Sequence, residues 1–268
     1  CSVPAGLVAD FYSGLLCVRF GMNTFLDRKA WRMSALALGL LGAVSAPWTF
    51  AAEPGNTNHL AGHAQQGTQV KWTPASLRVA LSEMPAGDVS KGKVLHNDLF
   101  CASCHGVAGE ALTPNWPSLA GQRAEYTYKM LLDYHSGLRR EDERAGVMNA
   151  VAEMLSKQDM ADLAAFYAAQ SLPAAAHAAD AATAQLIRRG EPSRLVTPCA
   201  SCHGLHGQGG INETPALAGL PRDYFIRTMQ HYRDGSRHND ALQAMRAFAK
   251  PLTDAEIMAL ADYYAPAP

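Results

Sequence analysis

The chain has 268 residues, of which 48% are hydrophobic and 18% are charged, and its formal net charge is −1 at pH 7. This is the composition of an ordinary globular protein, and the length allows one or two domains. The near-neutral charge gives no indication of nucleic-acid binding, for which a marked basic excess would be expected.

Residues 1–52 are expected to be upstream sequence followed by a cleaved export signal. A basic start at residues 28–32, a short apolar run over residues 33–44 and small residues before position 53 are typical of such a signal. The apolar run is too short to span a bilayer comfortably, and an uncleaved anchor is the alternative. After cleavage 19 basic and 22 acidic side chains remain, a net charge of −3, with four of the six cysteines. The predicted location is the periplasm.

Residues 53–84 form an N-terminal extension that lies outside the internal repeat described below. Its second half predicts one short helix, with Thr73 as the N-cap and Pro74 as the first helical residue.

The pentapeptide Cys-Ala-Ser-Cys-His occurs at residues 101–105 and again, unchanged, at residues 199–203. In this signature two thiols attach to the vinyl groups of a haem, and the adjacent histidine becomes an axial ligand of its iron. A C-x-x-C pair alone would also suit zinc or thiol redox chemistry. Two identical copies favour two covalently bound haem c groups, held by Cys101, Cys104, Cys199 and Cys202, with His105 and His203 on the irons.

The two halves of the chain resemble each other well beyond the pentapeptide. Residues 117–121 match residues 215–219 at an offset of 98, and Tyr126 and Tyr224 match at the same offset. The sequence therefore predicts two domains, joined by an alanine-rich linker. Their predicted bounds are 85–172 for the first domain, 173–183 for the linker and 184–268 for the second domain.

Each domain is predicted to be helical, and no strand-like alternation is evident. Helices are expected over residues 88–100 and 123–135, and a capping box begins the final helix of each domain. The box residues are Ser156 with Asp159 and Thr253 with Glu256. Pro192 is expected to shorten or break the first helix of the second domain. The predicted fold class is all-α, with two tandem helical haem domains related by duplication.

Met148 and Met245 are the candidate sixth ligands of the two irons. Of the ten methionines, only these two occupy matching positions in the repeat, and both precede the final helix in the same frame. A thioether opposite a histidine fills the coordination sphere and raises the reduction potential. The alternative is a pair of duplicated core methionines.

Two further repeated pairs are candidates for supporting roles. The backbone carbonyls of Pro117 and Pro215 lie 12 residues after the motif histidines and are expected to fix the histidine tautomer. Two interpretations stay open for Arg139 and Arg237, either a pair with a haem propionate or a solvated loop charge. The other histidines of the two domains are not expected to bind iron: His96, His135, His206, His231 and His238.

Together these motifs resemble class I cytochromes c and, specifically, the two-haem cytochrome c4 family. The resemblance covers residues 86–268 and rests on C-A-S-C-H-G twice, P-x-L-A-G twice, the Y-x-x-G-x-R loop and M-x-x-x-A-x-x-L-[ST] before the final helix. It implies two cytochrome c folds packed about a pseudo-twofold axis. It also implies electron transfer from a quinol-oxidising complex or a dehydrogenase toward a terminal oxidase. The extension at residues 53–84 and the proline-containing first helix of the second domain depart from the family pattern.

The predicted function is a periplasmic electron carrier, not an enzyme, with redox proteins as partners. Association with a membrane surface is expected only through membrane-bound partners. A dedicated cytochrome subunit of a dehydrogenase or flavocytochrome complex is the alternative, with residues 53–84 as its interaction segment. A two-haem peroxidase is a third possibility, but it requires an open iron position, which the repeated methionines disfavour.

Overall fold

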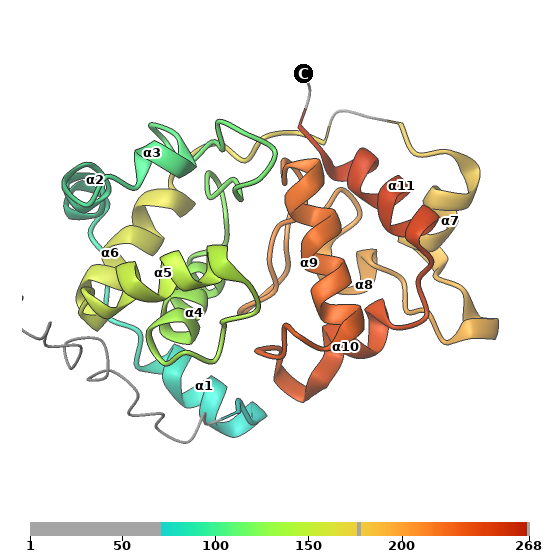
Figure 1. Ribbon diagram of the computed structural model, residues 1–268, viewed down its shortest axis with the longest axis horizontal. Helices are drawn as coiled ribbons and strands as arrows, with labels where there is room; N and C mark the ends of the chain where they lie inside the picture. Colours follow the sequence, from blue (N-terminus) through green and yellow to red (C-terminus); the bar gives the residue numbers. More distant parts are fainter. Residues whose placement is uncertain (1–70, 176–177, 267–268) are drawn as a thin grey trace, which may run out of the picture. The chain divides into compact units, whose positions relative to one another are not determined.

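The structure is a computed structural model in which residues 71–175 and 178–266 are described. The expected export signal and residues 53–70 of the extension lie outside these ranges. Within them the chain forms helices joined by loops, with two isolated β-bridges and no strand (Figure 1). The prediction of an all-α fold is confirmed. None of the described helices is both long and apolar enough to cross a lipid bilayer.

The helices fall before and after the linker. Before it lie α1 (Pro74–Ser82), α2 (Val89–Asp98), α3 (Ala102–His105), α4 (Ala124–His135), α5 (Glu143–Glu153) and α6 (Lys157–Ala168). After it lie α7 (Ala181–Arg189), η2 (Pro192–Arg194), α8 (Ala200–His203), α9 (Arg222–Asp234), η3 (Ala241–Gln243), α10 (Ala244–Ala249) and α11 (Asp254–Tyr264). Helices α5 and α10, which carry Met148 and Met245, were not predicted from the sequence.

Several helices begin at a side-chain cap, and two of these caps are the boxes that the sequence predicts. The carboxylate of Asp88 accepts the backbone N–H groups of Ser90 and Lys91 at 2.8 and 3.0 Å and so starts α2. Capping boxes start α6 at Ser156 and α11 at Thr253. Each cap satisfies N–H groups that the first turn leaves without partners and contributes about 1 kcal/mol.

Close contact between α2 and α6 organises the first domain. A Cβ atom added to Gly92 would lie 2.0 Å from the carbonyl oxygen of Asp162, so only glycine lets the helices approach this closely. Beyond the crossing, the rings of Phe166 and Tyr167 pack beside the buried ring of His96, with centroids 5.2 and 5.6 Å away.

The second domain differs from the first at its first helix. Helix α7 begins at Ala181, inside the range 173–183 that the sequence assigns to the linker, and ends before Gly190, which has a φ of +68°. Pro192 then starts the short helix η2. The helix therefore stops ahead of the proline, as predicted, because proline lacks the N–H group that would continue the hydrogen-bond ladder.

Direct hydrogen bonds join the two domains. We call the region where residues of the two domains contact each other the junction. The backbone N–H of Tyr224 donates to the carbonyl of Pro114 at 3.0 Å. The buried side chain of Gln122 makes two bonds to the backbone of Ala216: its Nε2 donates to the carbonyl at 3.1 Å and its Oε1 accepts the N–H at 2.8 Å. These bonds fix the relative position of the segments that line the site described next.

Candidate functional site

Each pentapeptide forms a short helix that turns its histidine toward the interior. Cys101 and Cys199 immediately precede α3 and α8, and His105 and His203 end these helices with 7% of their surface exposed. The chain then turns at a glycine with a φ of +79° in the first domain and +80° in the second. Side chains other than glycine rarely adopt this conformation, so the turn after each histidine depends on glycine.

Both motif histidines have one ring nitrogen held by the backbone. The Nδ1 atom of His105 lies 3.0 Å from the carbonyl oxygen of Pro117, and the Nδ1 atom of His203 lies 2.8 Å from that of Pro215. A proton on Nδ1 leaves the lone pair of Nε2 for a metal. Burial lowers the pKa of both histidines, and the proline carbonyls oppose this effect. The neutral imidazole that a metal requires is therefore favoured.

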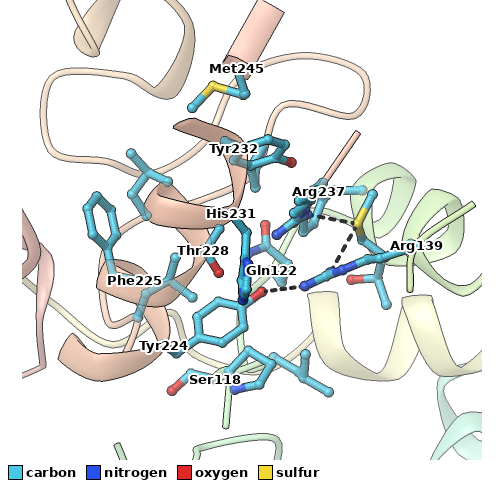
Figure 2. Close-up of a pocket in the computed structure, with 18 of the residues that line it drawn as sticks. Ser118, Gln122, Arg139, Tyr224, Phe225, Thr228, His231, Tyr232, Arg237 and Met245 are labelled. Carbon is cyan, nitrogen blue, oxygen red and sulfur yellow. Dashed lines mark hydrogen bonds between the residues drawn. The ribbon is translucent and has the colours of Figure 1, made fainter. Parts of the chain in front are cut away.

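One cavity of about 480 Å³ is lined by both motifs and by both candidate methionines. Met148 comes from α5 and Met245 from α10, and both side chains are half-buried. Figure 2 shows part of this cavity, with Met245 among its lining residues. The structure thus brings the predicted thiols, imidazoles and thioethers to the wall of the same cavity.

The chemistry of this lining fits haem. None of the four motif cysteines forms a disulfide, so each thiol is available for a thioether bond to a haem vinyl group. Two thiols, an imidazole and a thioether per domain, around a mostly apolar cavity, form the donor set of a covalently attached haem with histidine and methionine ligands. Among the described residues no group of three or more His, Cys, Asp or Glu side chains could hold a metal ion.

Arg139 and Arg237 are buried at the junction, with 6% and 1% of their surface exposed. The interpretation of these arginines as solvated loop charges is therefore wrong. Each donates through Nη2 to a tyrosine hydroxyl of the other domain. Arg139 donates to Tyr224 at 3.3 Å (Figure 2). Arg237 donates to Tyr126 at 3.2 Å. The Nη1 atom of Arg237 has no hydrogen-bond partner among the described residues. A buried guanidinium with an unpaired N–H beside the cavity suits a carboxylate such as a haem propionate.

The sulfur of Met130 occupies the space between the two guanidinium groups. It accepts an N–H from each of Arg139, Arg237 and Asn239, all at 3.4 Å. Burial alone would raise the pKa of Tyr224, but Arg139 and Arg237 outweigh burial and lower it. Arg139 already pairs through Nε with the buried carboxylate of Glu141 at 3.0 Å, so the guanidinium left for a further anionic group is that of Arg237.

Two of the histidines that were not expected to bind iron have other partners. The Nδ1 atom of His96 lies 2.9 Å from the hydroxyl oxygen of Tyr167. The Nδ1 atom of His135 lies 2.8 Å from the carbonyl oxygen of Ala152. Both rings thus have structural contacts within the first domain.

Sequence reasoning missed several residues that complete the site. Met130 aligns with Thr228 in the repeat and Gln122 aligns with Leu220, so comparison of the two halves could not single them out. Tyr126 and Tyr224 are repeated, which signals importance, but their contact with the opposite arginine depends on how the domains pack.

Comparisons with known proteins agree with this geometry. The family model described as cytochrome c matches residues 89–169, and the model described as cytochrome C oxidase, cbb3-type, subunit III matches residues 193–263. Each matched segment contains one pentapeptide and one candidate methionine.

Relatives and a solved structure match across both domains. Cytochrome c4 of Thiocapsa roseopersicina is 39% identical over 183 residues, which cover 66% of this chain and 91% of that protein. The thiosulfate dehydrogenase electron acceptor of Stutzerimonas stutzeri (strain A1501) is 31% identical over 208 residues, covering 73% of this chain and 94% of that protein. The crystal structure of reduced recombinant cytochrome c4 from Pseudomonas stutzeri superimposes with a TM-score of 0.59 at 31% identity, over 68% of this chain and 99% of that one.

Proposed function

Because this chain belongs to the two-haem cytochrome c4 family, we propose that it is a periplasmic electron carrier. Two covalently bound haem c groups make it an electron-transfer cytochrome. The proposed donor is a quinol-oxidising complex or a dehydrogenase, and the proposed acceptor is a terminal oxidase. The export pattern of residues 22–52 supports the periplasmic location.

The observation that carries this proposal is the matched lining of the two halves of the cavity. In the first domain Cys101 and Cys104 would attach the haem, and His105 and Met148 would ligate its iron. In the second domain the corresponding residues are Cys199, Cys202, His203 and Met245. All of them line the cavity.

Bound haem supplies a one-electron couple between Fe(II) and Fe(III), and the protein sets the conditions under which it operates. The carbonyls of Pro117 and Pro215 orient the imidazoles and increase their basicity. Met148 and Met245, as ligands of the irons, would exclude small ligands, so we expect that no substrate bond is made or broken. Arg139 and Arg237 would hold the propionates at the junction.

Optical spectra of the purified holoprotein test this proposal directly. We expect the ferric form to show the methionine–iron charge-transfer band and both reduced haems to leave added carbon monoxide unbound. If one reduced haem binds carbon monoxide readily in the wild-type protein, then Met148 or Met245 is not a firm ligand. The electron-carrier proposal would then fail in favour of a site open to chemistry.

A second candidate function is that of a dedicated acceptor for one dehydrogenase. The similarity to the thiosulfate dehydrogenase electron acceptor of Stutzerimonas stutzeri, which extends over 94% of that protein, favours it. Mixing the oxidised holoprotein with candidate dehydrogenases and their substrates, and following haem reduction, would separate the two functions. A general carrier would be reduced by several donors, whereas a dedicated acceptor would be reduced quickly by one and would co-purify with it.

A further inference from the structure

The described part of the N-terminal extension, residues 71–84, contacts both haem domains. Helix α1 starts at the capping residue Thr73, as predicted, and buries Leu77 to 4% exposure. Leu81 and Met84 pack against the hydrophobic core of the first domain. The same helix lies against η3 of the second domain. Residues 71–84 are therefore bound to their own chain at the place where the domains meet.

Trp72, just before α1, reaches a buried charged cluster at the junction. Its indole Nε1 donates to Oδ1 of Asp133 at 2.5 Å, and Asp133 has none of its surface exposed. The other oxygen of Asp133, Oδ2, accepts from Nζ of Lys129 at 2.5 Å and from Nδ2 of Asn239 at 2.6 Å. Lys129 also donates to the carbonyl of Asn239 at 2.7 Å. Asp133 thus joins the extension, the first domain and the second domain.

This cluster tolerates the loss of a partner poorly, because its charges are removed from water. Lys129 is only 3% exposed, and burial lowers its pKa while Asp133 acts to raise it. A buried ion pair is stable only when its remaining donors and acceptors are satisfied. The indole supplies the donor for Oδ1, and its ring lies 5.7 Å from Nζ of Lys129, where it covers the ammonium group.

The internal repeat explains why one side of the junction needs this extra residue. The repeat counterparts of Lys129 and Asp133 are Arg227 and His231. On their side Arg227 pairs with Asp142 of the first domain at 3.3 Å, and the histidine lies 3.6 Å from the same carboxylate. On that side the charged groups find their partners within the repeat itself. On the side with Asp133 the last hydrogen-bond donor comes from Trp72, which precedes the repeat.

We propose that Trp72 is a positioning residue and that residues 71–84 clamp the two domains together at Asp133 and Asn239. The clamp fixes the geometry of the junction. It also sets the rate of electron exchange between the haems, and this second role rests on the proposed two-haem function. In this proposal residues 71–84 bind the protein's own junction. They therefore do not belong to the segment that was considered for binding a dehydrogenase partner.

The test compares the wild-type holoprotein with W72F, which keeps an aromatic ring but loses the indole N–H. V79A is the matched control, since Val79 lies on α1 with 53% of its surface exposed. Hydrogen–deuterium exchange is measured over residues 124–139 and 222–243. The rate of electron exchange between the haems is measured after rapid one-electron reduction. We expect W72F to raise amide exchange at the junction by about tenfold, to slow inter-haem exchange, and to leave the optical spectrum of each haem unchanged. V79A should match the wild type in every readout.

N239A provides a second, independent variant that removes the side chain of the second domain from the cluster. If the clamp acts through Asp133, W72F combined with N239A should have less effect than the sum of the two single changes. Unchanged junction protection in either W72F or N239A would overturn the clamp. If the wild type shows no inter-haem exchange at all, the proposed function fails instead, and amide exchange still decides the clamp. Should W72F not assemble, N239A alone decides by the same criterion.

Discussion

Arg139 of the first domain donates to the hydroxyl of Tyr224 in the second domain at 3.3 Å, and Arg237 of the second returns the same contact to Tyr126 of the first at 3.2 Å. The repeat relates both arginines to each other and both tyrosines to each other. The contact is therefore a reciprocal one about the pseudo-twofold relation between the domains. It places two buried cations beside the cavity that the haem motifs line.

Removing one of these hydroxyls should weaken the junction. In Y224F, Nη2 of Arg139 loses its tyrosine acceptor in a buried position. We expect a loss of about 1–3 kcal/mol in the free energy of unfolding of the holoprotein, measured with denaturant. Tyr263 lies on α11 and is not one of the tyrosines that accept from the two arginines, so Y263F serves as the control. Its free energy of unfolding should stay within about 0.5 kcal/mol of the wild-type value. Equal stability of Y224F and the wild type would contradict a structural role for the reciprocal contact.

Gln122 offers a separate test of the junction, because it bonds to backbone atoms. Q122A would leave both the N–H and the carbonyl of Ala216 without the partners they have at 2.8 and 3.1 Å. We expect a loss of about 1–3 kcal/mol in unfolding free energy. Q230A, at an exposed position on α9, is the control and should change stability little. A similar loss in the two variants would show that the amide bridge contributes nothing specific.

The two candidate methionines can be tested one at a time. M148A or M245A should open one iron each, so that half of the reduced haem binds carbon monoxide and the potential of that haem falls. M154A, whose side chain is 64% exposed, should leave both haems closed. Carbon monoxide difference spectra and a potentiometric titration give the result. Failure of M148A to open a haem would return Met148 to the alternative of a core methionine.

His96 predicts a pH dependence of stability in the first domain. Burial lowers the pKa of His96 from its ordinary value of 6.5, so the unfolded chain binds a proton more readily than the folded one. The contribution of the neutral ring to the free energy of unfolding is complete above pH 6.5. It is lost as the pH falls below this value. The difference in unfolding free energy between wild type and H96Q should therefore shrink as the pH is lowered through this range. H206Q, on an exposed loop, is the control and should follow the wild-type pH profile.

Glu256 predicts a second pH effect, in the second domain and at lower pH. Its hydrogen bond with Arg194, together with the capping contacts of Thr253, lowers its pKa to about 2. The stabilisation is complete above the ordinary value of 4.5 and is lost as the pH falls toward 2. E256Q should unfold with a flatter acid profile between these limits, as measured by circular dichroism. An unchanged acid profile in E256Q would show that the carboxylate does not stabilise α11.

Local interactions explain why much of the fold could be predicted from the sequence. The caps at Asp88, Ser156 and Thr253 involve residues two or three positions apart, so a short stretch of chain determines where those helices begin. Helix α10 was missed because no side-chain cap marks its start. Helix α5 does begin at such a cap, since Asp142 accepts the N–H of Ala145 at 2.7 Å, but this local signal was overlooked in the sequence. Helix α10 has six residues and follows Leu242 and Gln243, which both have a positive φ.

The two haem motifs, the duplication, the helical class and the family resemblance can be read from the chain alone, because each depends on residue identity at fixed spacing. The roles of Arg139, Arg237 and Trp72 depend on how the domains pack. Their partners lie 85, 111 and 61 positions away, and burial among those partners makes them junction residues instead of solvated charges or part of a free segment. Hydrogen bonds between distant, desolvated groups exist only after the domains have packed, so no local pattern records them.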